Sequence, residues 1–214
     1  VYDALVLGTK DYVEKNNFRG VLIGSSGGID SALTAAIAHD ALGKGRVKTI
    51  MMPFDFTADI SIEDAGSLAK NLGIEHSEIS IKDMYESFSI ALKESFEGMG
   101  IDKTEENLQS RCRGVTLMAL SNKLGFLVLT TGNKSEAAVG YSTLYGDTAG
   151  GFSVLKDVSK NLVYELANYR NSLSVVIPKR IIERPPSAEL APDQKDTDSL
   201  PDYDRLDPVS YTHL

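Results

Sequence analysis

Gly24-Ser25-Ser26-Gly27-Gly28-Ile29-Asp30-Ser31 decides the fold, because it joins a short apolar run to a run of helix formers. Val21-Leu22-Ile23 before it predicts a strand, and residues 32–38 after it predict a helix. The three glycines allow positive φ angles and a close approach of the backbone to a ligand. A glycine loop at a helix start directs unpaired N–H groups and the positive end of the helix dipole toward one point. We therefore expect this loop to bind an anion such as phosphate.

Two well-known phosphate-binding patterns are absent from this loop. A P-loop of the type GxxxxGK[ST] needs Gly-Lys where Ile29-Asp30 stands. No GxGxxG pattern follows the strand, which disfavours a dinucleotide-binding fold. The alternative without a ligand is a glycine-rich turn in which Asp30 or Ser31 caps the helix.

The composition is that of one globular domain, or of one domain with a tail. Of the 214 residues, 42% are hydrophobic, which is enough for a buried core. A formal net charge of −8 argues against wholesale binding to nucleic acid or to an anionic membrane. Cys112 is the only cysteine, so the sequence allows neither an intramolecular disulfide nor a cysteine metal cluster. Without a membrane-length apolar run or a signal-peptide pattern at its start, the chain is expected to be cytoplasmic.

Strands and helices alternate along the chain. We expect strands at 21–23, 47–52, 75–81 and 126–131, and helices at 2–16, 61–72, 83–96, 105–123 and 160–169. The helix from 61 should begin with a variant of the capping box and end at Gly73. In the two helices between 83 and 123 we expect these side chains to face the core: Met84, Phe88, Ala91, Leu92, Leu108, Cys112, Val115, Met118 and Ala119. The order predicts an α/β fold, a doubly wound, mostly parallel sheet with helices on both faces.

Ligands of such a sheet bind beyond the carboxyl ends of its strands, so the loops 24–31, 52–58 and 131–151 should converge there. The Ser-Gly-Gly-x-Asp-Ser pattern resembles the pyrophosphate-binding loop of the ATP pyrophosphatase superfamily, whose fold is adenine nucleotide alpha hydrolase-like. These enzymes cut ATP between its α- and β-phosphates and transfer AMP to a substrate oxygen. The resemblance implies that ATP is bound by all eight loop residues, namely Gly24, Ser25, Ser26, Gly27, Gly28, Ile29, Asp30 and Ser31. It also implies that Asp30 holds the Mg²⁺ that leaves with pyrophosphate.

A second stretch of sequence resembles one particular family within this superfamily. Thr131-Gly132-Asn133-Lys134-Ser135-Glu136, with the following residues 139–147, is similar to NAD synthetase, and in particular to the synthetase domain of the glutamine-dependent bacterial enzymes. Arg184-Pro185-Pro186-Ser187-Ala188-Glu189-Leu190 is a third matching motif. The match extends from about Leu5 to Pro208, which is nearly the whole chain.

This resemblance implies a role in ATP binding for Thr131, Lys160 and Ser187. Glu136 would be the second magnesium ligand beside Asp30, since two carboxylates plus phosphate oxygens suit that ion. Without the resemblance, Glu136 could equally be an acid that stabilises the first turn of a helix, rather than a metal ligand. Lys160 could be a solvated surface lysine, rather than a residue that binds ATP.

Two further residues would contact the second substrate, deamido-NAD. Arg111 matches an arginine that contacts this dinucleotide in the family, and its planar guanidinium suits a phosphate or a carboxylate. Asp147 either contacts the same substrate or caps a turn. The histidines His39, His76 and His213, and Cys112, are expected to be non-catalytic.

The implied reaction makes NAD in two steps. The nicotinate carboxylate of deamido-NAD attacks the α-phosphate of ATP, magnesium-pyrophosphate leaves, and ammonia then attacks the acyl-adenylate to give NAD and AMP. The ammonia would come from solution or from a glutaminase domain or subunit, and the family pattern implies a homodimer with substrate at the subunit boundary. The alternatives are another ATP pyrophosphatase such as a GMP synthetase-like or tRNA-thiolating enzyme, a nucleotide-binding module without turnover, and an inert fragment of the enzyme.

The sequence departs from the family in three places. Leu144 stands where ammonia-dependent relatives have a lysine, so that lysine contact cannot be transferred. Residues 54–58 differ from the Tyr-Ser-Ser of relatives, which leaves their role open. We divide the chain into an ATP pyrophosphatase domain, 1–190, and an acidic loop or lid with a truncated tail, 191–214, whose residues 209–214 match nothing in the family and are expected to be an artefact. The acids of this segment are expected to be solvated: Asp193, Asp196, Asp198, Asp202, Asp204 and Asp207.

Overall fold

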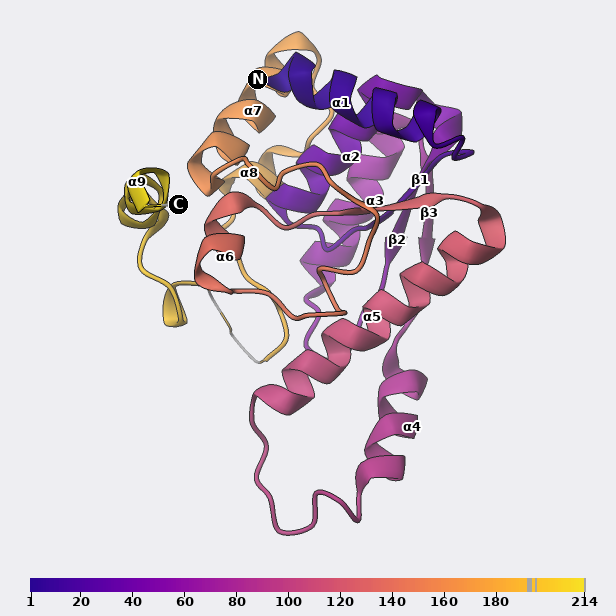
Figure 1. Ribbon diagram of the computed structural model, residues 1–214, viewed down its shortest axis with the longest axis vertical. Coiled ribbons are helices and arrows are strands. Elements are labelled where there is room, and N and C mark those ends of the chain that lie inside the picture. Colours follow the sequence, from indigo (N-terminus) through magenta and orange to yellow (C-terminus); the bar gives the residue numbers. More distant parts are fainter. Residues whose placement is uncertain (192–193, 195, 214) are drawn as a thin grey trace.

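A single parallel sheet forms the centre of the protein (Figure 1), whose computed structural model describes residues 1–191, 194 and 196–213. Its strand order is β3-β2-β1-β4-β5. The strands are β1 (Val21–Gly24), β2 (Val47–Met51), β3 (Glu75–Glu78), β4 (Leu127–Thr130) and β5 (Phe152–Ser153). The four predicted strands are confirmed, although β3 ends three residues early. The sequence gives no signal for β5, because two residues are too few to show an alternating pattern.

Helices connect the strands and cover the sheet. They are α1 (Tyr2–Lys15), α2 (Ile29–Leu42), α3 (Asp59–Leu72), α4 (Lys82–Leu92), α5 (Lys103–Leu124), α6 (Lys134–Val139), α7 (Lys160–Leu173), α8 (Lys179–Glu183) and α9 (Tyr203–His213). Short 3₁₀ turns occupy Lys44–Arg46 and Asp196–Asp198. The predicted helices are confirmed within a few residues at their ends, except that α4 ends at Leu92 rather than near residue 96.

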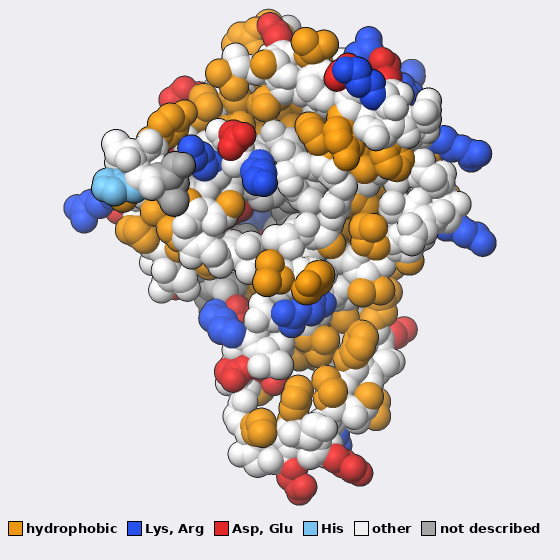
Figure 2. Space-filling view, in the orientation of Figure 1, with side chains coloured by type: hydrophobic (Ala, Val, Ile, Leu, Met, Phe, Trp, Pro, Cys, Tyr) orange, Lys and Arg blue, Asp and Glu red, His pale blue; other side chains and the backbone are white. Residues whose placement is uncertain are grey.

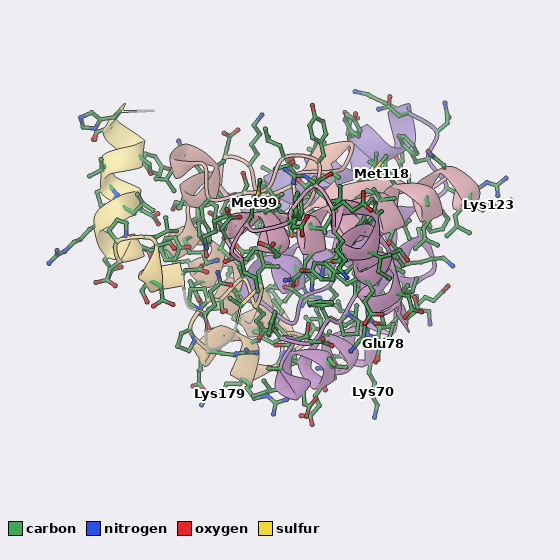
Figure 3. All side chains as sticks on the ribbon, turned by 90° about the horizontal axis from the view of Figure 1, so that it is seen from below. Lys70, Glu78, Met99, Met118, Lys123 and Lys179 are labelled. Atoms are coloured by element: carbon green, nitrogen blue, oxygen red, sulfur yellow. The ribbon has the colours of Figure 1, made fainter. Side chains whose placement is uncertain are left out.

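The strands of the centre are buried on both faces, as expected for a doubly wound sheet. Val21 and Ile23 pack into a core shared with α1, α2, α3 and α7. Leu22, which points to the other face, packs into a second core with α5. Figure 3 shows the two layers, with Met118 of α5 on one side of the molecule and Lys70 of α3 on the other. The predicted fold class is therefore confirmed.

The start of α3 differs from the prediction. The helix begins at Asp59 after Ala58, whose side chain makes no capping hydrogen bond, so the capping box predicted at Ser61 is wrong. The Ser61 hydroxyl instead donates to Glu189 Oε1 at 2.7 Å, a partner 128 residues away that no local pattern reveals. The predicted end is confirmed, since Gly73 has a left-handed φ of 65°.

Five side chains that were expected to face the core are exposed instead. They are Phe88, Ala91, Val115, Met118 and Ala119. The reason is that α4, α5 and the segment between them extend past the sheet, so only a narrow stripe of each helix meets the core (Figure 1). Cys112 is buried, and Met84, Leu92 and Leu108 are half-buried. Hydrophobic side chains consequently gather on the surface of this protruding part (Figure 2).

Asp40 joins three helices on the other face of the sheet. Its carboxylate accepts hydrogen bonds from Nε and Nη2 of Arg170 at 2.6 and 3.0 Å, and from the Tyr2 hydroxyl at 2.8 Å. Burial opposes the charge of Asp40, but these donors outweigh it and lower the pKa of the carboxyl group. Asp40 thus holds α1 and α7 against α2.

We expect Asp40→Ala to lower the free energy of unfolding by about 3 kcal/mol, because it leaves the guanidinium of Arg170, which is largely buried, without its charge partner. Urea denaturation would measure the change. The control is Asp11→Ala, which removes an exposed i,i+4 pair with Lys15 and should cost less than about 0.5 kcal/mol. Equal losses in the two variants would contradict the role given to Asp40.

Candidate active site

A cavity of about 250 Å³ lies at the carboxyl ends of β1, β2 and β4. Its walls include residues of all three loops that the sequence brings to this edge. Met52 and Thr57 come from the second loop, and the third contributes Thr131, Gly132, Glu136, Tyr141, Gly146, Asp147 and Ala149. Figure 2 shows this face of the molecule hollowed near its middle. The predicted convergence of the loops is therefore confirmed.

Most of the predicted site residues line this cavity. They are Gly24, Ser25, Ser26, Gly28, Ile29, Asp30, Ser31, Thr131, Glu136, Asp147, Lys160 and Ser187. Gly27 instead lines a smaller neighbouring pocket. Arg111 lies outside both pockets on the exposed side of α5.

The glycine loop is fixed by its own hydroxyl groups and by α3. Ser31 Oγ donates to the Gly28 carbonyl at 3.0 Å, and the Gly28 amide donates to Ser26 Oγ at 3.2 Å. Gly28, in an extended conformation, is the residue that precedes the first turn of α2, so the alternative of a helix cap at Asp30 or Ser31 is wrong. Gly27 has a φ of 75° and lies directly against the Ser61 backbone, which leaves no room for a side chain.

Asp30, Glu136 and Lys160 meet in the wall of the cavity. The Lys160 ammonium lies 2.5 Å from Asp30 Oδ2 and 3.2 Å from Glu136 Oε1. The side chain of Lys160 is only 2% exposed, and those of the two acids are 17% and 19% exposed. Two carboxylates from different loops thus converge on one cationic group.

Asn133 completes this cluster, although it was not predicted from the sequence to be a site residue. Its side-chain amide donates to Asp30 Oδ1 at 2.9 Å, and its carbonyl oxygen accepts the Glu136 amide at 3.0 Å. The spacing Asn-x-x-Glu is that of a capping box, and both of its hydrogen bonds are present at the start of α6. That spacing is the signal that identifies Asn133 as the residue orienting both acids.

The charges in the cluster are strongly coupled. Burial and the neighbouring charge of Asp30 raise the pKa of Glu136 well above its usual range. Burial disfavours a charged lysine, but the two carboxylates outweigh that effect and raise the pKa of Lys160. A positive charge at the start of α7 is repelled by the positive end of the helix dipole. The attraction of the two acids offsets this repulsion and explains why a lysine can occupy the position.

The cluster fits magnesium only in the presence of further ligands. Two carboxylates provide at most part of the octahedral shell that Mg²⁺ requires, and phosphate oxygens or water must supply the rest. In the described part of the chain, no group of three or more His, Cys, Asp or Glu side chains is arranged to hold a metal. The donor set therefore suits a metal that arrives with a phosphate ligand beside the glycine loop.

The loop that carries Asp147 is seated directly on α5. A Cβ atom on Gly146 would lie 2.3 Å from Ser110 Oγ, and one on Gly114 would lie 2.6 Å from the Tyr145 carbonyl oxygen. Asp147 Oδ1 accepts a hydrogen bond from the backbone amide of Thr143 at 2.7 Å, which confirms the alternative that Asp147 caps a turn. Burial nevertheless raises the pKa of this carboxyl group, which also lines the cavity.

Arg113, also on α5, is a further charged residue of the cavity. Its Nε donates to the Met52 carbonyl at 3.0 Å, and its side chain lines the cavity. Burial lowers its pKa to about 10. No carboxylate within ion-pair distance is found for it among the residues that the structure describes.

Two acids of the segment 191–213 are buried, so the expectation that they are solvated is wrong for them. Asp196 lines the cavity and accepts the Tyr203 hydroxyl at 2.9 Å. Asp207 accepts the Asn161 amide at 2.9 Å and a short hydrogen bond from the Ser135 hydroxyl. Asp193 lies outside the described residues.

Comparison with known proteins identifies the family. The model of the NAD synthase family matches residues 1–212. The chain belongs to the NAD synthase family. Among curated members, the glutamine-dependent NAD(+) synthetase of Acinetobacter baylyi is 56% identical over all of this chain and 40% of its own length. That of Thermotoga maritima is 55% identical over 98% of this chain and 37% of its own.

Solved structures of the family share the fold. The glutamine-dependent NAD+ synthetase of Acinetobacter baumannii, solved in complex with adenosine diphosphate, matches with a TM-score of 0.85 and 52% identity over 100% of this chain and 38% of that one. The NMN synthetase of Francisella tularensis matches with a TM-score of 0.88 and 31% identity, and this chain covers 85% of it. The chain thus spans about 40% of the length of the curated relatives it matches. In the described residues, no helix combines the length and the apolar character needed to span a membrane.

Proposed function

We propose that the chain catalyses the ATP-dependent amidation of deamido-NAD to NAD in the cytoplasm, through an acyl-adenylate and with release of AMP and pyrophosphate. One observation carries the proposal. Asp30, from the glycine loop, and Glu136, from the loop after β4, both contact the Lys160 ammonium, at 2.5 and 3.2 Å. Two carboxylates from different loops are thus directed at one position. A nucleotide-binding module without turnover has no need for two acids beside its phosphate loop.

The residues of the site supply positioning and charge. The amides at the start of α2, beside the glycine loop, bind phosphate oxygens, with the α-phosphate above the loop. Asp30 and Glu136 hold Mg²⁺, which when bound neutralises charge on the departing pyrophosphate. Lys160, Thr131 and Ser187 contact the nucleotide from the other walls of the cavity. No protein nucleophile is required, because the carboxylate of the substrate attacks.

We also propose that the functional unit is a homodimer. Arg111, Val115 and Met118 form one stripe of α5, and all three side chains are exposed. A second copy packed on this stripe would bury its apolar residues and bring Arg111 to a substrate at the boundary between the subunits.

We expect the unaltered chain to sediment as a dimer and the Met118→Glu variant as a monomer. A monomeric unaltered chain would contradict the proposal.

The nitrogen donor in this proposal is ammonia. Curated relatives are named for their use of glutamine and are more than twice as long as this chain. A glutaminase domain or subunit that releases ammonia is therefore part of the proposal for the whole protein.

Exchange of labelled pyrophosphate into ATP tests the proposed reaction, because it reports adenylation without needing ammonia. We expect exchange with deamido-NAD and Mg²⁺, and none when either is left out. Exchange with nicotinate mononucleotide instead would favour the second candidate, an NMN-forming activity like the one for which the Francisella tularensis protein is named. Exchange with xanthosine monophosphate would favour a GMP synthetase-like enzyme, and ATP binding without exchange would favour a binding module or an inert fragment.

Metal–nucleotide binding should depend on pH through Glu136, whose pKa is raised to about 7 by burial and by Asp30. The ionised carboxylate is the form that binds a metal, so affinity for the magnesium complex of α,β-methylene-ATP should fall as the pH drops below that value, by up to about tenfold per pH unit. Calorimetry in two buffers of different ionisation enthalpy would show protons released on binding. Glu136→Gln is the control, since its proton release reports the nucleotide alone, and equal release in both proteins would contradict the prediction.

A further inference from the structure

We propose that Lys160 is a resident counter-cation that occupies the metal position of the site until the nucleotide arrives. Its ammonium group pairs with Asp30 and Glu136 in the nucleotide-free chain, and it moves to the phosphates when the metal–nucleotide complex binds. The site thereby admits its metal only together with nucleotide. This inference rests on the proposed function, because it takes the two acids as metal ligands.

The geometry places the lysine where the metal would be. Its nitrogen lies 2.5 Å from Asp30 Oδ2 and 3.2 Å from Glu136 Oε1, so it contacts one oxygen of each acid. A Mg²⁺ ion bound to the same two oxygens would lie about 2.1 Å from each. The ammonium and the ion would then occupy overlapping positions, so one excludes the other.

The two carboxylates need a cation beside them, but the Lys160 ammonium and a metal ion cannot both take that position. Two half-buried carboxylates without a counter-charge are costly, and Lys160 is the lysine or arginine that reaches both of them in the described part of the chain. A divalent ion brought to the same position would be repelled strongly by the lysine at so short a distance. A nucleotide solves this conflict because its phosphates offer the displaced ammonium new negative partners.

The backbone at Lys160 is fixed by hydrogen bonds, so any movement of the ammonium group comes from the side chain. Its amide donates to Ser135 Oγ at 2.9 Å, and the next amide, of Asn161, donates to Asp207 Oδ2 at 2.9 Å, which together fix the start of α7. The four-carbon side chain lines the cavity and ends 5.4 Å from the centre of the Tyr203 ring. In this inference, a change of side-chain rotamer carries the ammonium from the acids toward a bound phosphate.

Mn²⁺, whose free form gives an electron paramagnetic resonance signal, tests the inference in solution. We expect the unaltered chain to bind Mn²⁺ weakly without nucleotide, and much more tightly with α,β-methylene-ATP. Lys160→Met should bind Mn²⁺ without nucleotide at least about tenfold more tightly than the unaltered chain, because the competing charge is gone. The same variant should bind the nucleotide less tightly.

Two controls assign the effect to the site. Lys156→Met removes an exposed lysine just before α7 and should leave Mn²⁺ binding unchanged. Adding Asp30→Asn to Lys160→Met should abolish the gained affinity. If Lys160→Met does not fold, tight binding of Mn²⁺ by the unaltered chain without nucleotide would still overturn the inference, and weak binding that nucleotide strengthens would support it.

Pyrophosphate exchange separates this inference from the proposed function. Exchange with deamido-NAD, together with equal Mn²⁺ affinity in Lys160→Met and the unaltered chain, would overturn the inference alone. A gain of Mn²⁺ affinity without exchange would support the role of Lys160 and overturn the proposed reaction.

Discussion

Asp30→Asn should reduce the rate of pyrophosphate exchange by more than about 100-fold, because even residues that only support metal ligands cost 10- to 100-fold when they are replaced. The asparagine keeps the size of the side chain but removes the charge that holds the metal. The fold should persist, since Lys160 still pairs with Glu136 at 3.2 Å. The melting temperature and the affinity for the magnesium complex of α,β-methylene-ATP, measured with the exchange rate, would separate loss of the site from loss of the fold.

The control for Asp30→Asn is Asp11→Asn, the same chemical change on the exposed surface of α1. It should leave exchange and nucleotide binding unchanged. A variant Asp30→Asn that retained the exchange rate of the unaltered chain would show that this carboxylate does not hold the metal.

Gly27→Ala should abolish nucleotide binding. A Cβ atom at this position would lie 2.3 Å from the Ser61 carbonyl oxygen and 2.8 Å from Ser61 Cα, and these are backbone atoms that cannot turn aside. The φ of 75° adds a strain of about 1–2 kcal/mol for any residue with a side chain. The loop must therefore leave its position between α3 and the cavity, and calorimetry with the magnesium complex of α,β-methylene-ATP would measure the loss.

Gly73→Ala isolates the backbone strain from the collision. Gly73 has a similar φ of 65°, but the nearest atom to an added Cβ is 3.9 Å away, at the flexible Lys44 side chain. This variant should lose about 1 kcal/mol of stability and bind nucleotide normally. Similar nucleotide affinity in Gly27→Ala and Gly73→Ala would contradict the fit of the loop against α3.

The parts of the fold that local patterns encode were predictable. The glycine loop between Val21-Leu22-Ile23 and a helix, and the apolar run that became β4, are signals contained in a few neighbouring residues. Their order implies a doubly wound sheet, and the sheet brings Asp30 and Glu136 to one edge. The convergence of the two acids was therefore accessible from the sequence before any coordinates.

The parts that depend on distant contacts were not predictable. Ser61 looks like a helix cap, but Glu189, far along the chain, binds its hydroxyl. Phe88 and Val115 have the spacing of core residues, yet α4 and α5 extend beyond the sheet and leave them exposed. Lys160 looks like a surface lysine at a helix start, and only the folded chain shows the two acids that bury it.

Anomalous diffraction from crystals grown with Mn²⁺ and α,β-methylene-ATP tests the central claim most directly. We predict an anomalous peak in contact with both Asp30 and Glu136 and with phosphate oxygens above residues 24–31, with the Lys160 ammonium moved to a phosphate. A peak that touches neither carboxylate, or a nucleotide bound away from the glycine loop, would contradict the account.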